Sequence, residues 1–126
     1  MKKTIKLLTT LLCAMLVLTA CSKTVDISLE PEVKVFFSDN KEKTLTLKAG
    51  DEAYDLLDSW LKSHQGGWLT ASGQFAGGVY ILSGEYGIQI TEAKVIIYAA
   101  KGSKPMALYA QQITRSELKL LKELGN

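Results

Sequence analysis

The chain has 126 residues, with 15 Lys and Arg against 13 Asp and Glu, so its formal net charge at pH 7 is +2. Three of the basic residues and none of the acidic ones lie in the first twenty positions, which leaves twelve basic and thirteen acidic residues in the remainder, a net charge of −1. This balance excludes nucleic acid as a partner on grounds of net charge. The length beyond the leader suits one domain with one hydrophobic core.

Residues 1–20 have the layout of a secretory signal peptide. Lys2, Lys3 and Lys6 are followed by an apolar run from Leu7 to Ala20. A basic start, a short apolar stretch and small residues near its end are typical of such signals. The run contains three threonines, and it is shorter than the ~20 apolar residues that a membrane-spanning helix needs. We therefore expect the leader to be removed rather than to remain as a membrane span.

The end of the leader, Leu18-Thr19-Ala20-Cys21, resembles the lipobox of bacterial lipoproteins. The resemblance covers residues 1–21 and no family is recognised for the domain that follows. It implies that the Cys21 thiol receives a diacylglycerol, that the chain is cut between Ala20 and Cys21, and that the new amino group is acylated. Two or more acyl chains hold a protein firmly on a bilayer, at ~0.8 kcal/mol per buried CH₂. The alternative is an ordinary signal peptide cut near Ala20, with Cys21 left as a free thiol.

In lipoproteins of enteric bacteria, a residue other than aspartate after the lipidated cysteine is the sorting signal for the outer membrane. Ser22 resembles that signal. The resemblance thus implies a lipid-anchored protein of the cell envelope, on the outer membrane and facing the periplasm. The only other cysteine, Cys13, lies in the leader, so no disulfide is expected.

Residues 21–31 are interpreted as the lipidated cysteine and a tether, and residues 32–126 as a single α+β domain that begins after Pro31. Extended, the tether would reach roughly 30 Å at ~3.3 Å per residue. The alternation of Val25, Ile27 and Leu29 leaves an alternative open, in which this segment adds an edge strand to the domain.

The domain begins with two segments that alternate apolar and polar residues, 32–37 and 44–48, joined by a polar turn. A helix then follows from a helix-capping Asp51 to a stop at Gly66-Gly67. Its apolar stripe has the helical period and comprises Ala53, Leu56, Leu57, Trp60, Leu61 and His64.

A glycine-rich middle section and the C-terminus complete the pattern. Strand character is found in 68–71, 79–82, 85–91, 93–99 and 105–112, and residues 93–99 are apolar on both faces, which is typical of an interior strand. Residues 114–117 fit a capping box, in which Thr114 and Glu117 bond each other's backbone N–H groups ahead of a last helix. We expect the order β-β-α-β-β-β-β-α, that is, a small two-layer α+β domain with two helices packed on a mainly antiparallel sheet.

No residue pattern predicts catalysis, a cofactor or a metal. His64 is the only histidine, and its position at the end of a helix stripe favours a capping role over an acid–base one. Asp51, Asp55 and Asp58 share a helix face, but a calcium site would need a loop with six or more oxygen ligands, so a solvated face is expected. The glycines fit no phosphate-binding motif.

The possible binding region consists of the aromatic residues in or near the glycine-rich section, since aromatic residues are enriched in interface hot spots. These residues are Trp68, Phe75, Tyr80 and Tyr86. A core position for two or more of them is the alternative. The leading hypothesis is a non-enzymatic protein-binding module on the envelope membrane, which binds another envelope protein or an incoming toxin as an inhibitor, an immunity protein or an assembly accessory. The alternative function is binding of a small ligand or a cell-wall glycan.

Overall fold

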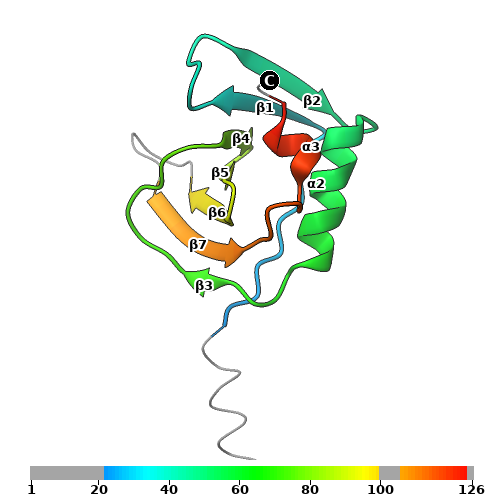
Figure 1. The fold of residues 1–126 in the computed structure, drawn as a ribbon. Coiled ribbons are helices and arrows are strands. Elements are labelled where there is room, and N and C mark those ends of the chain that lie inside the picture. Colours follow the sequence, from blue (N-terminus) through cyan, green and yellow to red (C-terminus); the bar gives the residue numbers. More distant parts are fainter. Residues whose placement is uncertain (1–21, 100–105, 125–126) are drawn as a thin grey trace, which may run out of the picture.

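The computed structural model describes residues 22–99 and 106–124 of the chain (Figure 1). These residues form one seven-stranded sheet and two helices. In chain order the elements are β1 (Glu32–Phe37), β2 (Thr44–Lys48), α2 (Glu52–Ser63), β3 (Leu69–Thr70), β4 (Val79–Ser83), β5 (Tyr86–Ile90), β6 (Lys94–Ala99), β7 (Met106–Gln112) and α3 (Lys119–Lys122).

The sheet is antiparallel throughout and has the spatial order β2-β1-β4-β5-β6-β7-β3. β4 to β7 form a meander. β1 pairs with β4, the first strand of the meander, and the two-residue β3 pairs with β7, the last. An antiparallel sheet with two helices agrees with the predicted small α+β class, although strands dominate the content. Five strands lie between the helices, instead of the four in the expected order, because every segment with strand character forms a strand.

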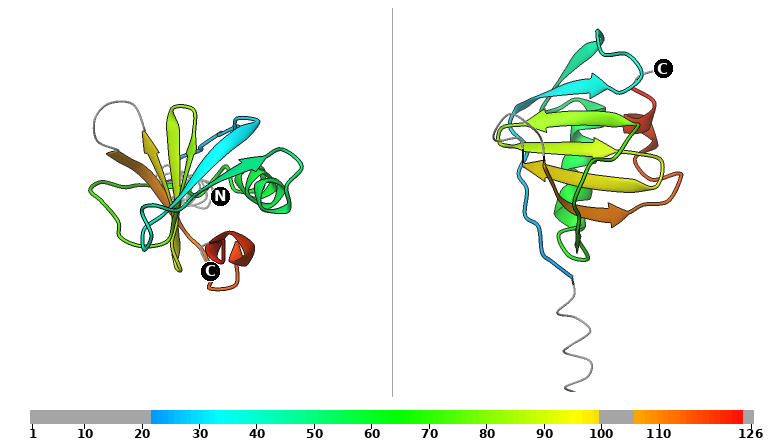
Figure 2. Two further views of the ribbon diagram at one scale, coloured as in Figure 1. Left: turned by 90° about the horizontal axis from the view of Figure 1, so that it is seen from above. Right: turned by 90° about the vertical axis from the view of Figure 1, so that its left-hand side faces the viewer.

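Both helices lie on the same side of the curved sheet (Figure 2). The buried side chains of α2 include Leu57, Trp60 and Leu61, as its period predicts. Each large apolar side chain buried in this way contributes roughly 1.5–3 kcal/mol. Leu56 is the exception in the predicted stripe, since it is 37% exposed, and Tyr54 is buried instead. Tyr54 tolerates burial because its hydroxyl donates a hydrogen bond of 2.8 Å to the carbonyl of Glu30.

The last helix is shorter than its capping signal suggests. The backbone N–H of Thr114 donates to the carboxylate of Glu117 at 3.1 Å, which is one half of the predicted capping box. The other half is missing, because the N–H of Glu117 donates to the Thr114 carbonyl at 3.2 Å and not to the Thr114 hydroxyl, which lies 3.4 Å from Ser116 Oγ. The α-helix begins only after Leu118, which has a left-handed φ of 56°. Leu118 and Leu121 are nevertheless buried in the core.

The second face of the sheet is also covered, by a loop instead of a helix. Ile96, Tyr98 and Ala107 form a separate buried cluster, against which Phe75 of the loop 71–78 packs. This explains why β6 is apolar on both faces and confirms its predicted interior position, between β5 and β7.

The residues expected to form a tether lie along the domain. Ile27 is only 5% exposed and Val25 and Leu29 pack against the core. Lys23 forms an isolated antiparallel bridge with Trp68, so the segment makes one strand-like contact but no continuous edge strand. Cys21 and the leader lie outside the described residues, and the lipobox therefore stays a prediction. No helix in the described part of the chain is long and apolar enough to cross a membrane.

Candidate functional site

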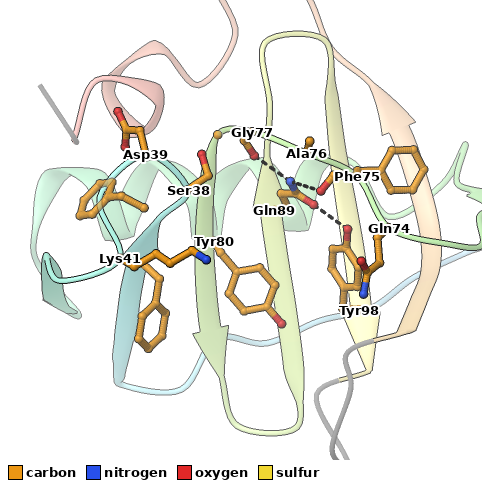
Figure 3. A pocket seen from close by; sticks show the side chains of 13 residues that line it. Ser38, Asp39, Lys41, Gln74, Phe75, Ala76, Gly77, Tyr80, Gln89 and Tyr98 are labelled. Carbon is orange, nitrogen blue, oxygen red and sulfur yellow. Dashed lines mark hydrogen bonds between the residues drawn. The ribbon is translucent and has the colours of Figure 1, made fainter.

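A hollow of about 740 Å³ opens on the sheet face that the helices leave free (Figure 3). Its floor is made by β4, β5 and β6, and its two sides by the β1–β2 turn and the loop 71–78. Its lining residues are Phe36, Phe37, Ser38, Asp39, Lys41, Gln74, Phe75, Ala76, Gly77, Gly78, Tyr80, Gln89 and Tyr98. The hollow thus combines residues 36–41, residues 74–80, Gln89 and Tyr98.

Aromatic side chains from neighbouring strands dominate the hollow. Phe36 of β1 stands directly opposite Tyr80 of β4 in the antiparallel register. The rings of Tyr80 and Tyr98 lie 5.8 Å apart between centroids, at an interplanar angle of 53°. Aromatic pairs of this kind, with centroids 4.5–7 Å apart, are mutually stabilising. The strands therefore hold these rings in place instead of leaving them on mobile loops.

Gly87 of β5 provides the seat for the Tyr80 ring. A Cβ atom at position 87 would lie 1.9 Å from the Tyr80 hydroxyl oxygen and 2.4 Å from the adjoining ring carbon. Any side chain there would push the ring away from β5. The glycine is therefore required by close approach of a side chain, not by its own backbone angles.

Gln89 fastens the loop 71–78 to the sheet. Its Nε2 donates to the carbonyls of Phe75 at 2.9 Å and Gly77 at 2.7 Å. Its Oε1 accepts a bond from the Tyr98 hydroxyl at 2.5 Å. Gln89 is only 6% exposed, and a buried amide is tolerated because its donors and acceptor are satisfied in this way. We call this group of four residues the Gln89 latch.

The polar chemistry of the hollow is mild. Burial raises the pKa of the Tyr80 and Tyr98 hydroxyls, so both are neutral hydrogen-bonding groups at physiological pH. The charged residues lie at the rim, where Asp39 and Lys41 are exposed. Lys94 lies outside the hollow, with its Nζ 5.5 Å from the centre of the Phe75 ring. The arrangement suits recognition of an apolar or aromatic group with a few polar contacts.

The four aromatic residues predicted as a binding region divide between the two faces. Phe75 and Tyr80 line the hollow. Trp68 is fully buried on the helix face, where its Nε1 donates to the carbonyl of His64 at 2.6 Å. Tyr86, 42% exposed, follows the β4–β5 turn and shares its face with Ile88 and Ile90.

The sequence reasoning missed Phe36, Tyr98 and Gln89 as parts of the site. A signal was present for two of them, because alternation along residues 32–37 and 93–99 puts Phe36 and Tyr98 on the faces opposite Val35 and Ile97, which are buried in the main core. What the alternation could not show is that β1 pairs with β4 and brings Phe36 beside Tyr80.

His64 has the surroundings of a helix cap. Its Nδ1 lies 2.8 Å from the carbonyl oxygen of Trp60, and its ring stacks on the Trp60 indole at 4.3 Å between centroids. Ser63 Oγ is 3.0 Å from the same nitrogen but also donates to the Trp60 carbonyl. These contacts tie both side chains to the end of α2.

The aspartates of α2 are bonded within their own helix or its preceding turn. Asp51 and Asp55 accept bonds from the backbone N–H groups of Lys48 and Gly50. Asp58 pairs with Lys62 at 2.8 Å. Asp51 occupies the helix N-cap position, as predicted, but its side chain bonds backward instead of capping the helix. Within residues 22–99 and 106–124, no group of three His, Cys, Asp or Glu residues is placed to hold a metal ion.

Comparison of the chain with models of protein families, with curated proteins and with solved structures found no match.

Proposed function

We propose that the chain is a lipid-anchored protein of the bacterial cell envelope whose single domain binds another protein without catalysing a reaction. The motif Leu18-Thr19-Ala20-Cys21 supports the anchor, through acylation of Cys21 after cleavage at Ala20. Ser22 supports a place on the outer membrane, facing the periplasm. The placement of His64, bonded to a helix carbonyl, supports a structural role for the one histidine.

The main support for protein binding is the aromatic hollow on the sheet face without helices. Phe36, Phe75 and Tyr80 offer apolar ring surface, and the exposed Asp39 and Lys41 form a polar rim. Buried aromatic anchors surrounded by a polar rim are the usual composition of an interface hot spot. We propose that a partner inserts an apolar or aromatic side chain here. The partner is an incoming toxin or hydrolase that the domain inhibits, or a component of envelope assembly.

A photocrosslinking experiment tests this proposal in cells. Gln74, exposed at the rim, is replaced by a photoreactive amino acid, and the crosslinked protein is identified by mass spectrometry. Capture of the same protein should fall strongly with Phe36→Ala and with Phe75→Ala. Tyr86→Ala is the matched control, because it removes an exposed aromatic ring from the other face. Capture that ignores Phe36 and Phe75, or that depends on Tyr86, would contradict the proposal.

The second candidate function is binding of a small ligand or a cell-wall glycan, and the size of the hollow favours it. A volume of about 740 Å³ lies within the roughly 300–1,000 Å³ of typical small-molecule pockets. Trp68 is no reporter for such binding, because it is buried on the opposite face. Thermal unfolding of residues 22–126 in the presence of purified muropeptides is the better test. A rise in Tm that disappears in Phe75→Ala and persists in Tyr86→Ala would favour this candidate over a protein partner.

A further inference from the structure

The chain joins the domain at one defined corner, beside the edge strand β3 (Figure 1). Lys23 and Trp68 exchange two backbone hydrogen bonds, N–H of Lys23 to O of Trp68 at 2.7 Å and N–H of Trp68 to O of Lys23 at 3.2 Å. Two residues later, the N–H of Val25 donates to the carbonyl of Gln65 at 2.7 Å. Ile27 then enters the core. From Lys23 onward the segment is therefore fixed to the domain.

This attachment leaves only a very short linker between a lipid on Cys21 and the domain. Consecutive Cα atoms are 3.8 Å apart, so whatever its conformation the Cα of Cys21 lies within about 8 Å of that of Lys23. A free tether from 21 to 31 would have allowed roughly 30 Å. Acyl chains on Cys21 would consequently hold the Lys23–Trp68 corner at the lipid headgroups instead of letting the domain move freely above them.

The surface at this corner suits contact with a bilayer interface. Leu69, the residue after Trp68, is 58% exposed on the short edge strand. Lys23 and Thr70 beside it are exposed as well. An apolar side chain next to a lysine, whose charged end reaches the headgroups, is a combination found at membrane surfaces.

We propose that the β3 corner, defined as Lys23, Leu69 and Thr70, rests on the lipid headgroups and orients the domain with the β1–β2 end of the sheet directed away from the membrane. This inference rests on the proposed acylation of Cys21. β3 and β1 lie five strand positions apart in the sheet order, or about 24 Å along the sheet at ~4.8 Å per strand. Figure 1 and the right-hand view of Figure 2 show the start of the described chain and the β1–β2 pair at opposite ends of the sheet. A partner would then reach the hollow from its β1–β2 side, because its Phe75 side lies beside Leu69 and Thr70.

The test uses the full-length, processed protein in vesicles of phosphatidylethanolamine and phosphatidylglycerol that contain nitroxide-labelled headgroups. A fluorophore is attached to Leu69→Cys or, as the control on the distant β1–β2 turn, to Asn40→Cys. Quenching should be several-fold stronger at position 69 than at position 40. A flexible Gly-Ser linker of about twelve residues inserted after Ser22 has a root-mean-square span of about 20 Å. It should remove most of this difference while the protein still floats with the vesicles.

The outcomes separate this inference from the proposed anchor. If mass spectrometry shows an unmodified Cys21 and the protein fails to float, the anchor is wrong and the orientation falls with it. If the protein is acylated and floats but both positions are quenched equally, the orientation alone is overturned. If the long linker leaves the difference in quenching unchanged, the short linker between Cys21 and Lys23 does not cause that difference, and the inference is likewise overturned.

Discussion

Replacement of Gln89 by leucine tests whether the Gln89 latch shapes the hollow. The change keeps the side chain's approximate size and removes three hydrogen bonds, to Phe75 O, Gly77 O and Tyr98 Oη. Each such bond contributes about 1 kcal/mol net, so the variant should lose about 2–4 kcal/mol of unfolding free energy. The loss of unfolding free energy is limited because the carbonyls of Phe75 and Gly77 can bond to water once the loop opens. A domain of this size has about 5–15 kcal/mol to lose, so it stays folded.

Two measurements check this prediction. Urea unfolding followed by circular dichroism measures the free energy, and hydrogen exchange reports the loop 71–78, which should exchange faster in the variant. Gln112→Leu is the matched control, since Gln112 is exposed on β7 and its replacement should change stability by less than about 0.5 kcal/mol. A loss as small as the control's, with unchanged exchange in the loop, would refute the assignment of Gln89 as the fastener of the hollow.

Three further predictions concern the same contacts. Gly87→Ala should lower the free energy of unfolding by about 1–3 kcal/mol, because the added methyl group overpacks against the Tyr80 ring. The loss should be much smaller in a Tyr80→Ala background. If urea unfolding shows that the losses of the two variants simply add, this reasoning is contradicted. The hydrogen bond from Trp60 lowers the pKa of Glu117 below its ordinary 4.5, so its carboxylate stabilises the fold above about pH 4.5, and this stability is lost as the pH falls through the lowered pKa. In Glu117→Gln the free energy of unfolding should therefore decline less steeply in acid. Parallel declines in the two proteins would argue against the bond. Burial raises the pKa of Tyr98, so Tyr98→Phe should remove a late component from the phenolate absorbance titration, and an unchanged late component would be the contrary result.

The elements with local signals were predictable, and those that depend on distant contacts were not. The stripe of α2 placed Leu57, Trp60 and Leu61 in the core because helical period alone determines which positions share a face. The exchange of Leu56 for Tyr54 was not predictable, since Tyr54 is buried only because the carbonyl of Glu30, 24 positions away, accepts its hydroxyl. The late start of α3 likewise follows from the left-handed Leu118, which no propensity indicates.

The candidate site was half predictable for the same reason. Aromatic type and glycine-rich surroundings pointed to Phe75 and Tyr80, and the alternation of residues 32–37 puts Phe36 on the face opposite Val35. Their assembly into one hollow depends on the β1–β4 register and on the Gln89 latch, which are both contacts between segments far apart in the chain. Trp68 was misleading because a large aromatic residue beside glycines suits a core as well as an interface.

The intact mass of the processed protein, purified from the membranes of a bacterium with lipoprotein-processing enzymes, shows directly whether Cys21 carries a lipid anchor. We expect a chain that begins at Cys21 and carries a diacylglycerol, with its amino group acylated. A chain that begins elsewhere, retains its leader, or presents an unmodified Cys21 would contradict it.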